Sequence, residues 1–326
     1  MRVTNAMLVN TFTGNLNNTL ERMGQLQTQM SSEHSKYAHI SDDPISLIYS
    51  QQARAKLRQV ADYQENVKTA QSWMVSVETG FDEMNELIKE ALDGVIQGAN
   101  DTLTPYDRTN IAAKVKQLRD QMLSTLNMTQ GDKYIYGGYN TLGHLDASGK
   151  SVAPFEFNAA TGAFTYNGDS LATAVAAPYA NDVVTIDVGV SAQMPLSFNG
   201  TRVAIYGYDS AGAPKTLIGL FDDLYNSLNN TNSSASDINK YIGELQQAQE
   251  HVLSMTSDIG GRTNRLDLLE NRYDSDEINY IEMKSNAEDA DEAELIMKYK
   301  MAETVYKAAL SSGSYIIQPT LMDYLR

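Results

Sequence analysis

The chain has 326 residues, no cysteine, and a formal net charge of −16 with an isoelectric point near 4.6. That negative field repels nucleic acid and anionic membrane surfaces, and no apolar run approaches the roughly 18 residues that a membrane span needs, so neither partner is expected. No basic stretch followed by an apolar core opens the sequence, so we expect no cleavable secretion signal.

The N-terminal segment predicts an amphipathic helix. Its apolar positions include Phe12, Leu16, Leu20 and Met23, and Arg2 is the only charged side chain among the first twenty residues. A lone helix of this kind is marginal in water. Its apolar face therefore needs cover, either from the C-terminal end of the same chain or from neighbouring subunits.

Three heptad seams follow. Between residues 60 and 95 the apolar steps alternate three and four without a miss, and a second seam runs from 111 to 125, behind Thr104 as N-cap and Pro105 at the first helical position. The third runs from 238 to 290 and stays in phase through Met297 and Met301. It predicts one helix from about 237 to 312, roughly 110 Å long at 1.5 Å per residue. The molecule is therefore expected to be a mainly α, elongated rod of long coiled-coil-like helices.

Between residues 142 and 214 the heptads give way to short β-like runs, which predict a small inserted β domain. The runs are 155–157, 164–166, 183–188 and 203–208, separated by turn signals at 167–169, 199–200 and 210–212. Helix is expected to resume near Leu220. We expect the insert to be dispensable for assembly.

Catalytic and metal-binding patterns are missing from the sequence. The four histidines show no ligand spacing, and there is no phosphate-binding glycine loop. We therefore expect no enzyme, no cofactor and no metal site.

Two adjacent glycines interrupt the third seam. A glycine inside a helix costs roughly 1 kcal/mol relative to alanine, so Gly260 and Gly261 need a reason. One is the close approach of another backbone, within the rod or from the next subunit; the other is a local bend in a long helix.

Four segments, taken in order, resemble the flagellin-like superfamily, and within it the proteins of the hook–filament junction. They are the turn Ser41, Asp42, Asp43, Pro44; the aromatic and glycine stretch 133–141; the segment 259–266 with Gly260, Gly261, Arg262 and Asn264; and the C-terminal stretch 316–325. In the first, Asp43 can cap a helix that begins at Pro44.

The resemblance implies a structural component of the bacterial flagellum. It would be exported unfolded by the flagellar type III apparatus, escorted by a cytosolic chaperone, and assembled outside the cell as a ring that contacts the other junction protein and flagellin. It also implies a terminal assembly domain in which residues 1–44 pair with 290–326, a helical rod of 45–141 plus 215–289, and the insert at 142–214.

Subunit assembly is assigned to apolar residues at the two ends of the chain: Phe12, Leu16, Leu20, Met23, Met297, Met301, Val305, Ile316, Ile317, Leu321, Met322 and Leu325. Flagellin itself, which forms the filament, is the alternative within the superfamily. A surface adhesin that reads glycans with its β insert is an alternative from another class.

Overall fold

The computed structural model describes residues 5–32, 36–37, 42–99, 104–145, 149–158, 162–171, 183–230 and 233–316. They divide between two compact units: unit 1 comprises Met1–Ala61 with Asp274–Arg326, and unit 2 comprises Asp62–Tyr273. The predicted mainly helical fold with a small β-rich segment is confirmed. Within the described ranges, no helix has the length and apolarity that crossing a membrane requires.

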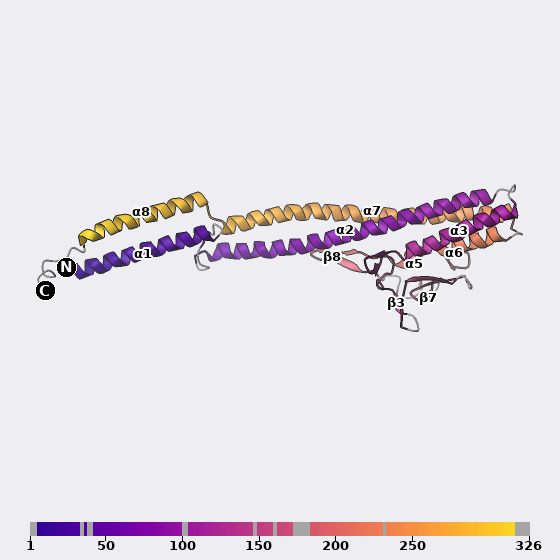
Figure 1. Cartoon of the computed structure of the whole chain (residues 1–326), viewed down its shortest axis with the longest axis horizontal. Coiled ribbons are helices and arrows are strands. Elements are labelled where there is room, and N and C mark those ends of the chain that lie inside the picture. The colour runs from indigo at the N-terminus through magenta and orange to yellow at the C-terminus, as the bar shows by residue number, and fades with distance from the viewer. Residues whose placement is uncertain are drawn as a thin grey trace. The chain divides into compact units, whose positions relative to one another are not determined.

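In unit 1, helix α1 (Asn5–Ser31) packs along helix α8 (Glu292–Ile316) (Figure 1). Leu26, Leu295 and Ala302 form the buried cluster between them, with Met23 and Tyr299 packed against it. At the far end of the pair the Phe12 ring lies against Gly313, where an added Cβ would come within 2.4 Å of the ring. The two terminal helices therefore cover part of each other's apolar surface within one chain.

The predicted single helix from 237 to 312 is wrong, because two helices occupy that stretch. Helix α7 (Ala235–Glu288) ends before Asp289, and α8 begins afresh behind Asp291. The carboxylate of Asp291 accepts a hydrogen bond from the backbone N–H of Ala293 at 2.9 Å, which is the usual bond of an N-cap. The heptad count that carried the seam through residue 290 therefore loses its phase at this break.

Helix α2 (Pro44–Gly98) begins as expected. The Asp43 carboxylate accepts hydrogen bonds from the N–H of Ser46 at 3.0 Å and from its hydroxyl at 2.6 Å, and these bonds lower the Asp43 pKa. Further along α2, Arg54 donates to both carboxylate oxygens of Glu288 at 2.5 and 2.7 Å, and the Ser50 hydroxyl bonds the same carboxylate. These contacts tie the first turns of α2 to the last residue of α7.

In unit 2, the seams of α2, α3 (Pro105–Leu126) and α7 form the core, together with α6 (Leu217–Asn229). The predicted seam positions are largely buried, including Val67, Met74, Phe81, Ile88 and Val95 of α2. Thr104 caps α3 in a reciprocal capping box, with Pro105 in the first turn as predicted. The first two seams, and the third as far as Tyr273, are therefore confirmed, whereas the predicted seam position Met283 is 39% exposed.

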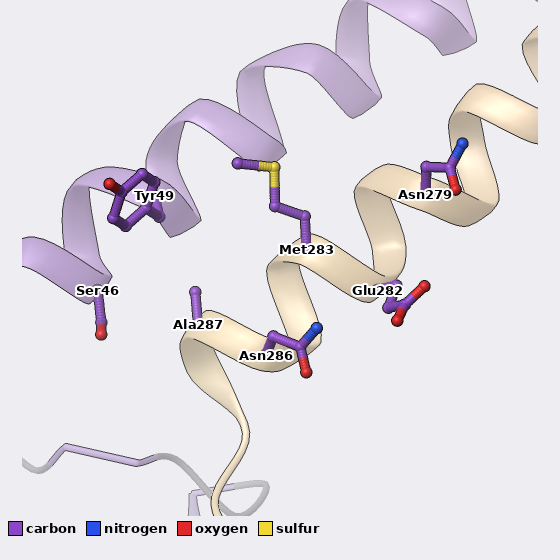
Figure 2. A pocket seen from close by; sticks show the side chains of 7 residues that line it. All are labelled: Ser46, Tyr49, Asn279, Glu282, Met283, Asn286 and Ala287. Atoms are coloured by element: carbon purple, nitrogen blue, oxygen red, sulfur yellow. The ribbon is translucent and has the colours of Figure 1, made fainter.

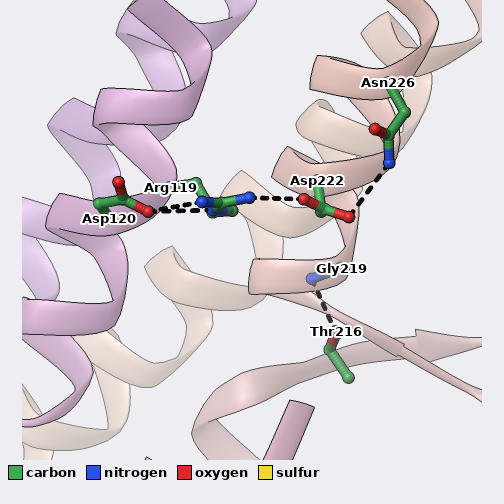
Figure 3. Close-up of polar contacts among 6 residues, drawn as sticks. All are labelled: Arg119, Asp120, Thr216, Gly219, Asp222 and Asn226. Carbon is green, nitrogen blue, oxygen red and sulfur yellow. Dashed lines mark hydrogen bonds and ion pairs between the residues drawn. The ribbon is translucent and has the colours of Figure 1, made fainter. Parts of the chain in front are cut away.

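Helices α3 and α6 pair through a partly buried ion pair (Figure 3). Arg119 lies between the carboxylates of Asp120 and Asp222, with nitrogen–oxygen distances of 2.8 and 2.6 Å, and Asp222 also accepts from Asn226 at 3.1 Å. The Arg119 guanidinium is 4.6 Å from the centre of the Phe157 ring. A single buried cation thus joins two helices and the β segment.

The β segment consists of five small antiparallel sheets in the described residues: β1–β2, β3–β4, β5–β6–β7, β8–β9 and β10–β11. The bounds are β1 (Thr129–Gln130), β2 (Lys133–Tyr134), β3 (His144–Leu145), β4 (Ser151–Val152), β5 (Phe155–Asn158), β6 (Ala163–Tyr166), β7 (Asp169–Ser170), β8 (Thr185–Gly189), β9 (Ala192–Pro195), β10 (Ile205–Tyr208) and β11 (Pro214–Thr216). The turn at Asn167 and Gly168 has positive φ at both residues, 54° and 86°, as its Asn-Gly sequence predicts.

Two local predictions in this segment are wrong. Asn199 and Gly200 do not form a turn, because the Asn199 side chain accepts from the Thr201 N–H at 2.8 Å and caps the short helix α5 (Gly200–Ala204). The strand expected from Val203 therefore starts only at Ile205, where β10 begins. An asparagine before a glycine is compatible with a turn or with a helix N-cap, and here Gly200 is a buried first residue of the helix.

Aromatic rings of the described part of the β segment pack against helix α2. The Phe81 ring of α2 lies 5.5 Å from the Tyr136 ring and 5.8 Å from the Phe198 ring, centre to centre. The rings of Phe155 and Tyr166, which are also buried, lie 5.0 Å apart, centre to centre, and are tilted by 43°. Replacing all of 142–214 would remove Phe198, Phe155 and Tyr166 from this core, at a cost in stability; that the insert is dispensable for assembly stays a prediction.

Candidate assembly surface

An apolar stripe on α8 is one of the exposed hydrophobic features of unit 1. Met297, Met301 and Val305 follow one another at four-residue spacing, so they share one face of the helix, and they are 58%, 63% and 53% exposed. The described positions of α8 that are buried or half-buried are different ones: Leu295, Tyr299, Ala302, Glu303, Tyr306, Ala309 and Gly313. The stripe is thus left more than half exposed, with Met301 and Val305 at the edge of the α1–α8 contact.

The predicted assembly residues of α1 divide between two environments. Phe12, Leu16 and Met23 are half-buried, whereas Leu20 is 43% exposed, because the inward heptad position is Thr19 instead. Three of the four residues assigned to subunit contacts therefore lie in the monomer's own α1–α8 interface or at its edge. Met7 and Leu8 near the start of α1 add exposed apolar surface.

A groove of about 310 Å³ lies between α1 and α8, next to the stripe. Met301 and Val305 form its apolar wall, and Arg22 and Lys298 provide positive charge. Lys298 is held by Glu294 at 2.8 Å, one turn earlier on α8. The surface therefore offers an apolar strip beside basic side chains, which suits packing against another helix.

A second apolar groove, of about 420 Å³, lies where the start of α2 meets the end of α7. Figure 2 shows the Met283 side chain extending from α7 toward α2, where Tyr49 and Ser46 stand. Ile45, Ile48, Tyr49, Ile278 and Ile281 are each at least half exposed nearby. Sequence analysis did not predict this groove, although large apolar residues outside the heptad seam indicate an exposed apolar surface here.

The remaining predicted assembly residues lie at the C-terminus. Ile316 is the last residue of α8. Ile317, Leu321, Met322 and Leu325 fall outside the described residues, so their assignment to assembly stays a prediction.

The motif residues have structural roles inside the chain. Asp42 and Asp43 precede α2, with Asp43 as its cap and Pro44 as its first residue; Ser41 falls outside the described residues. Asn264 is exposed on α7. An added Cβ at Gly260 or Gly261 would meet no atom within 4 Å, and α7 continues through both. Close backbone approach within the chain is therefore not their explanation.

Arg262, next to those glycines, ties α7 to the β segment. Its guanidinium is 4.5 Å from the centre of the Phe198 ring, donates to the Pro195 carbonyl at 3.2 Å, and pairs with Asp258 at 2.9 Å. The ring contact uses the flat face of the guanidinium, the carbonyl contact uses one of its N–H donors, and the ion pair uses its charge. A lysine would keep the ion pair and lose most of the rest.

No group of three or more acidic, histidine or cysteine side chains in the described ranges is placed to hold a metal ion. The surfaces of unit 1 are instead suited to protein contacts.

Comparison with known proteins agrees with this geometry. The model of the bacterial flagellin N-terminal helical region matches residues 3–141. The flagellar hook-associated protein 3 of Salmonella typhimurium is 24% identical over 322 residues, 95% of each chain, and that of Escherichia coli is 22% identical over 289 residues, 82% of each chain. The N-terminal part of this chain thus matches the flagellin family model, and the chain as a whole is similar to hook-associated protein 3.

Solved structures share the fold of this flagellin-like chain. A hook-associated protein described as putative, from Vibrio parahaemolyticus, aligns with a TM-score of 0.63 at 22% identity over 76% of this chain and 100% of its own. The flagellar junction protein FlgL of Legionella pneumophila aligns with a TM-score of 0.57 at 15% identity, over 75% and 100%.

The aromatic and glycine motif of the flagellin-like chain holds the β segment against α2. Tyr136 is fully buried, its hydroxyl donates to the Val77 carbonyl at 3.2 Å, and its own carbonyl accepts from the Tyr166 hydroxyl at 3.3 Å. Burial raises the pKa of Tyr136, so it stays protonated and a donor. Gly80 of α2 leaves the space that the Tyr136 hydroxyl occupies.

Proposed function

We propose that this chain is a self-assembling structural subunit of the bacterial flagellum that joins the hook to the filament. Full-length similarity to hook-associated protein 3 supports the proposal, together with one structural observation that carries it. That observation is the stripe of Met297, Met301 and Val305, which the chain's own α1 leaves exposed. Burying one such side chain is worth about 1.5–3 kcal/mol, so the stripe can supply several kcal/mol per subunit.

A second copy of the chain is the first partner that we propose, in a ring. The other hook–filament junction protein on the hook side and flagellin on the filament side are the next ones. Export through the flagellar type III apparatus, with a cytosolic chaperone holding the C-terminal segment that includes Ile317, Leu321, Met322 and Leu325, would protect these apolar residues before assembly.

Deleting the gene tests the proposal. A cell without a junction subunit is expected to lose its filaments and release flagellin into the medium, because flagellin then has no base on which to polymerise. If the chain were flagellin itself, the deletion would leave no flagellin in the medium. Normal filaments in the deletion strain would contradict the proposal.

The stripe is tested by complementing the deletion with Met301→Asp/Val305→Asp. Both side chains are exposed, so the variant is expected to fold and be exported, and to fail at incorporation. Val190→Asp is the matched control, since Val190 is 72% exposed in the turn between β8 and β9 and lies outside unit 1. Full motility with Met301→Asp/Val305→Asp would rule out the stripe as an assembly contact.

A further inference from the structure

The methionines of this chain are distributed unevenly. The chain has fourteen methionines and no cysteine, so thioethers are its only sulfur groups. The buried ones among the described residues belong to unit 2: Met74, Met84, Met122, Met194 and Met255. The exposed ones belong to unit 1: Met7, Met283, Met297 and Met301.

Met297 and Met301 combine three properties. They are 58% and 63% exposed, one helical turn apart on the same face of α8, and they make up most of the stripe described above. An oxidant that reaches the free subunit therefore meets both sulfur atoms at the surface that assembly must bury. With no thiol in the chain, no cysteine can consume the oxidant first.

We propose that Met297 and Met301 are oxidation sites through which a peroxide disables the subunit's assembly surface; this inference rests on the proposed function. A lone pair of the thioether sulfur attacks one peroxide oxygen and the O–O bond breaks. The attacked oxygen stays on the sulfur as a sulfoxide, and the other oxygen takes up its proton and leaves as water. The sulfur is oxidised by two electrons, the peroxide is reduced by two, and methionine sulfoxide reductases reverse the change.

The sulfoxide leaves the monomer intact and damages the interface. Both side chains are solvated in the free chain, so a polar oxygen there costs the fold little. In an assembled ring the same oxygen would be buried against apolar surface without a donor. Lys298, which lies between the two methionines, is already paired with Glu294. Two sulfoxides on one face should lower incorporation by at least about tenfold.

The chemical part is tested on the purified full-length chain with hydrogen peroxide and peptide mass spectrometry. Met297 and Met301 are expected to oxidise at least about tenfold faster than Met74 and Met84, because the latter have no accessible surface. Circular dichroism should remain unchanged. Equal oxidation rates at the four sites in a chain that keeps its helical signal would overturn the inference.

The functional part uses flagella from the deletion strain, to which purified chains are added and incorporation is measured by immunolabelling. Oxidised wild type should incorporate at least about tenfold less than untreated chain, and methionine sulfoxide reductase should restore it. Oxidised M297L/M301L should incorporate normally, since leucine conserves volume and carries no sulfur. Oxidised M283L, which keeps both stripe methionines, should fail like wild type.

The outcomes separate this inference from the proposed function. Failure of the untreated chain to incorporate would overturn the proposed function, and this inference with it. Normal incorporation of the oxidised wild type, or failure of oxidised M297L/M301L while the untreated double variant succeeds, would overturn this inference alone.

Discussion

A single alanine at Gly80 tests how the β segment is attached to the helices. Gly80 is an interior residue of α2, where alanine would ordinarily stabilise a helix by about 1 kcal/mol. Here an added Cβ would stand 2.3 Å from the Tyr136 hydroxyl oxygen and 3.3 Å from the ring carbon that bears it. We expect Gly80→Ala to destabilise unit 2 despite its better helix propensity.

The magnitude follows from two opposing effects. Overpacking a buried site costs about 1–3 kcal/mol, and the propensity gain returns about 1, so a net loss of about 1–2 kcal/mol is expected. Tyr136→Phe removes the clashing oxygen and one hydrogen bond, at a cost of about 1 kcal/mol. In that background Gly80→Ala should cost far less than in wild type, which gives a coupling energy of about 1–2 kcal/mol.

Urea unfolding followed by tryptophan fluorescence measures these changes. Trp73 is the chain's single tryptophan, buried on α2 seven residues before Gly80. Gly243→Ala is the matched control, because Gly243 lies inside α7 with no atom within 4 Å of an added Cβ, and it should stabilise by about 0.5–1 kcal/mol. A Gly80→Ala chain as stabilised as the Gly243→Ala chain would refute the reasoning.

Three further substitutions address polar contacts. Glu288→Gln should destabilise unit 1 by about 1–2 kcal/mol at pH 7, measured by amide hydrogen exchange. Hydrogen bonds from α2 hold the pKa of Glu288 below its ordinary value of 4.5. The stability that Glu288 contributes is therefore present above pH 4.5 and is lost as the pH falls through the lowered pKa. Arg262→Lys should speed amide exchange in β9, where Arg265→Lys, on the exposed side of α7, should not. Arg119→Met should cost about 2–4 kcal/mol in urea by stranding its α6 carboxylate, whereas exposed Asp120→Asn should cost at most about 1. If amide exchange or urea stability of any of these three variants equalled that of the wild type, the contact that the substitution removes would not stabilise the fold.

The heptad seams were predictable because burial in a helix recurs every three or four residues, and Val67 to Val95 follow that rule without exception. The caps at Thr104 and Asp43 were predictable for a similar reason, since their signals lie within four residues of the helix start. Local chemistry decides both features, so the sequence alone carries them.

Contacts between distant segments were not predictable in the same way. Nothing near Gly80 indicates that Tyr136 will need its space, and nothing near Arg262 indicates a ring at Phe198. The break at 289–291 was missed because the acidic residues around it read as a solvated helix face, although Asp291 is a good N-cap. That omission put the expected seam of α8 on the wrong face.

The phase change at this break explains how α8 comes to have two apolar faces. Had the α7 heptad continued, Met297 and Met301 would point at the chain's own core. Because α8 restarts behind Asp291, Leu295 and Ala302 face α1 instead, and the two methionines stay more than half exposed with Val305. A helix with two apolar surfaces needs a partner for each. Helix α1 covers one side, and the other is the reason to expect that this subunit is complete only in an assembly.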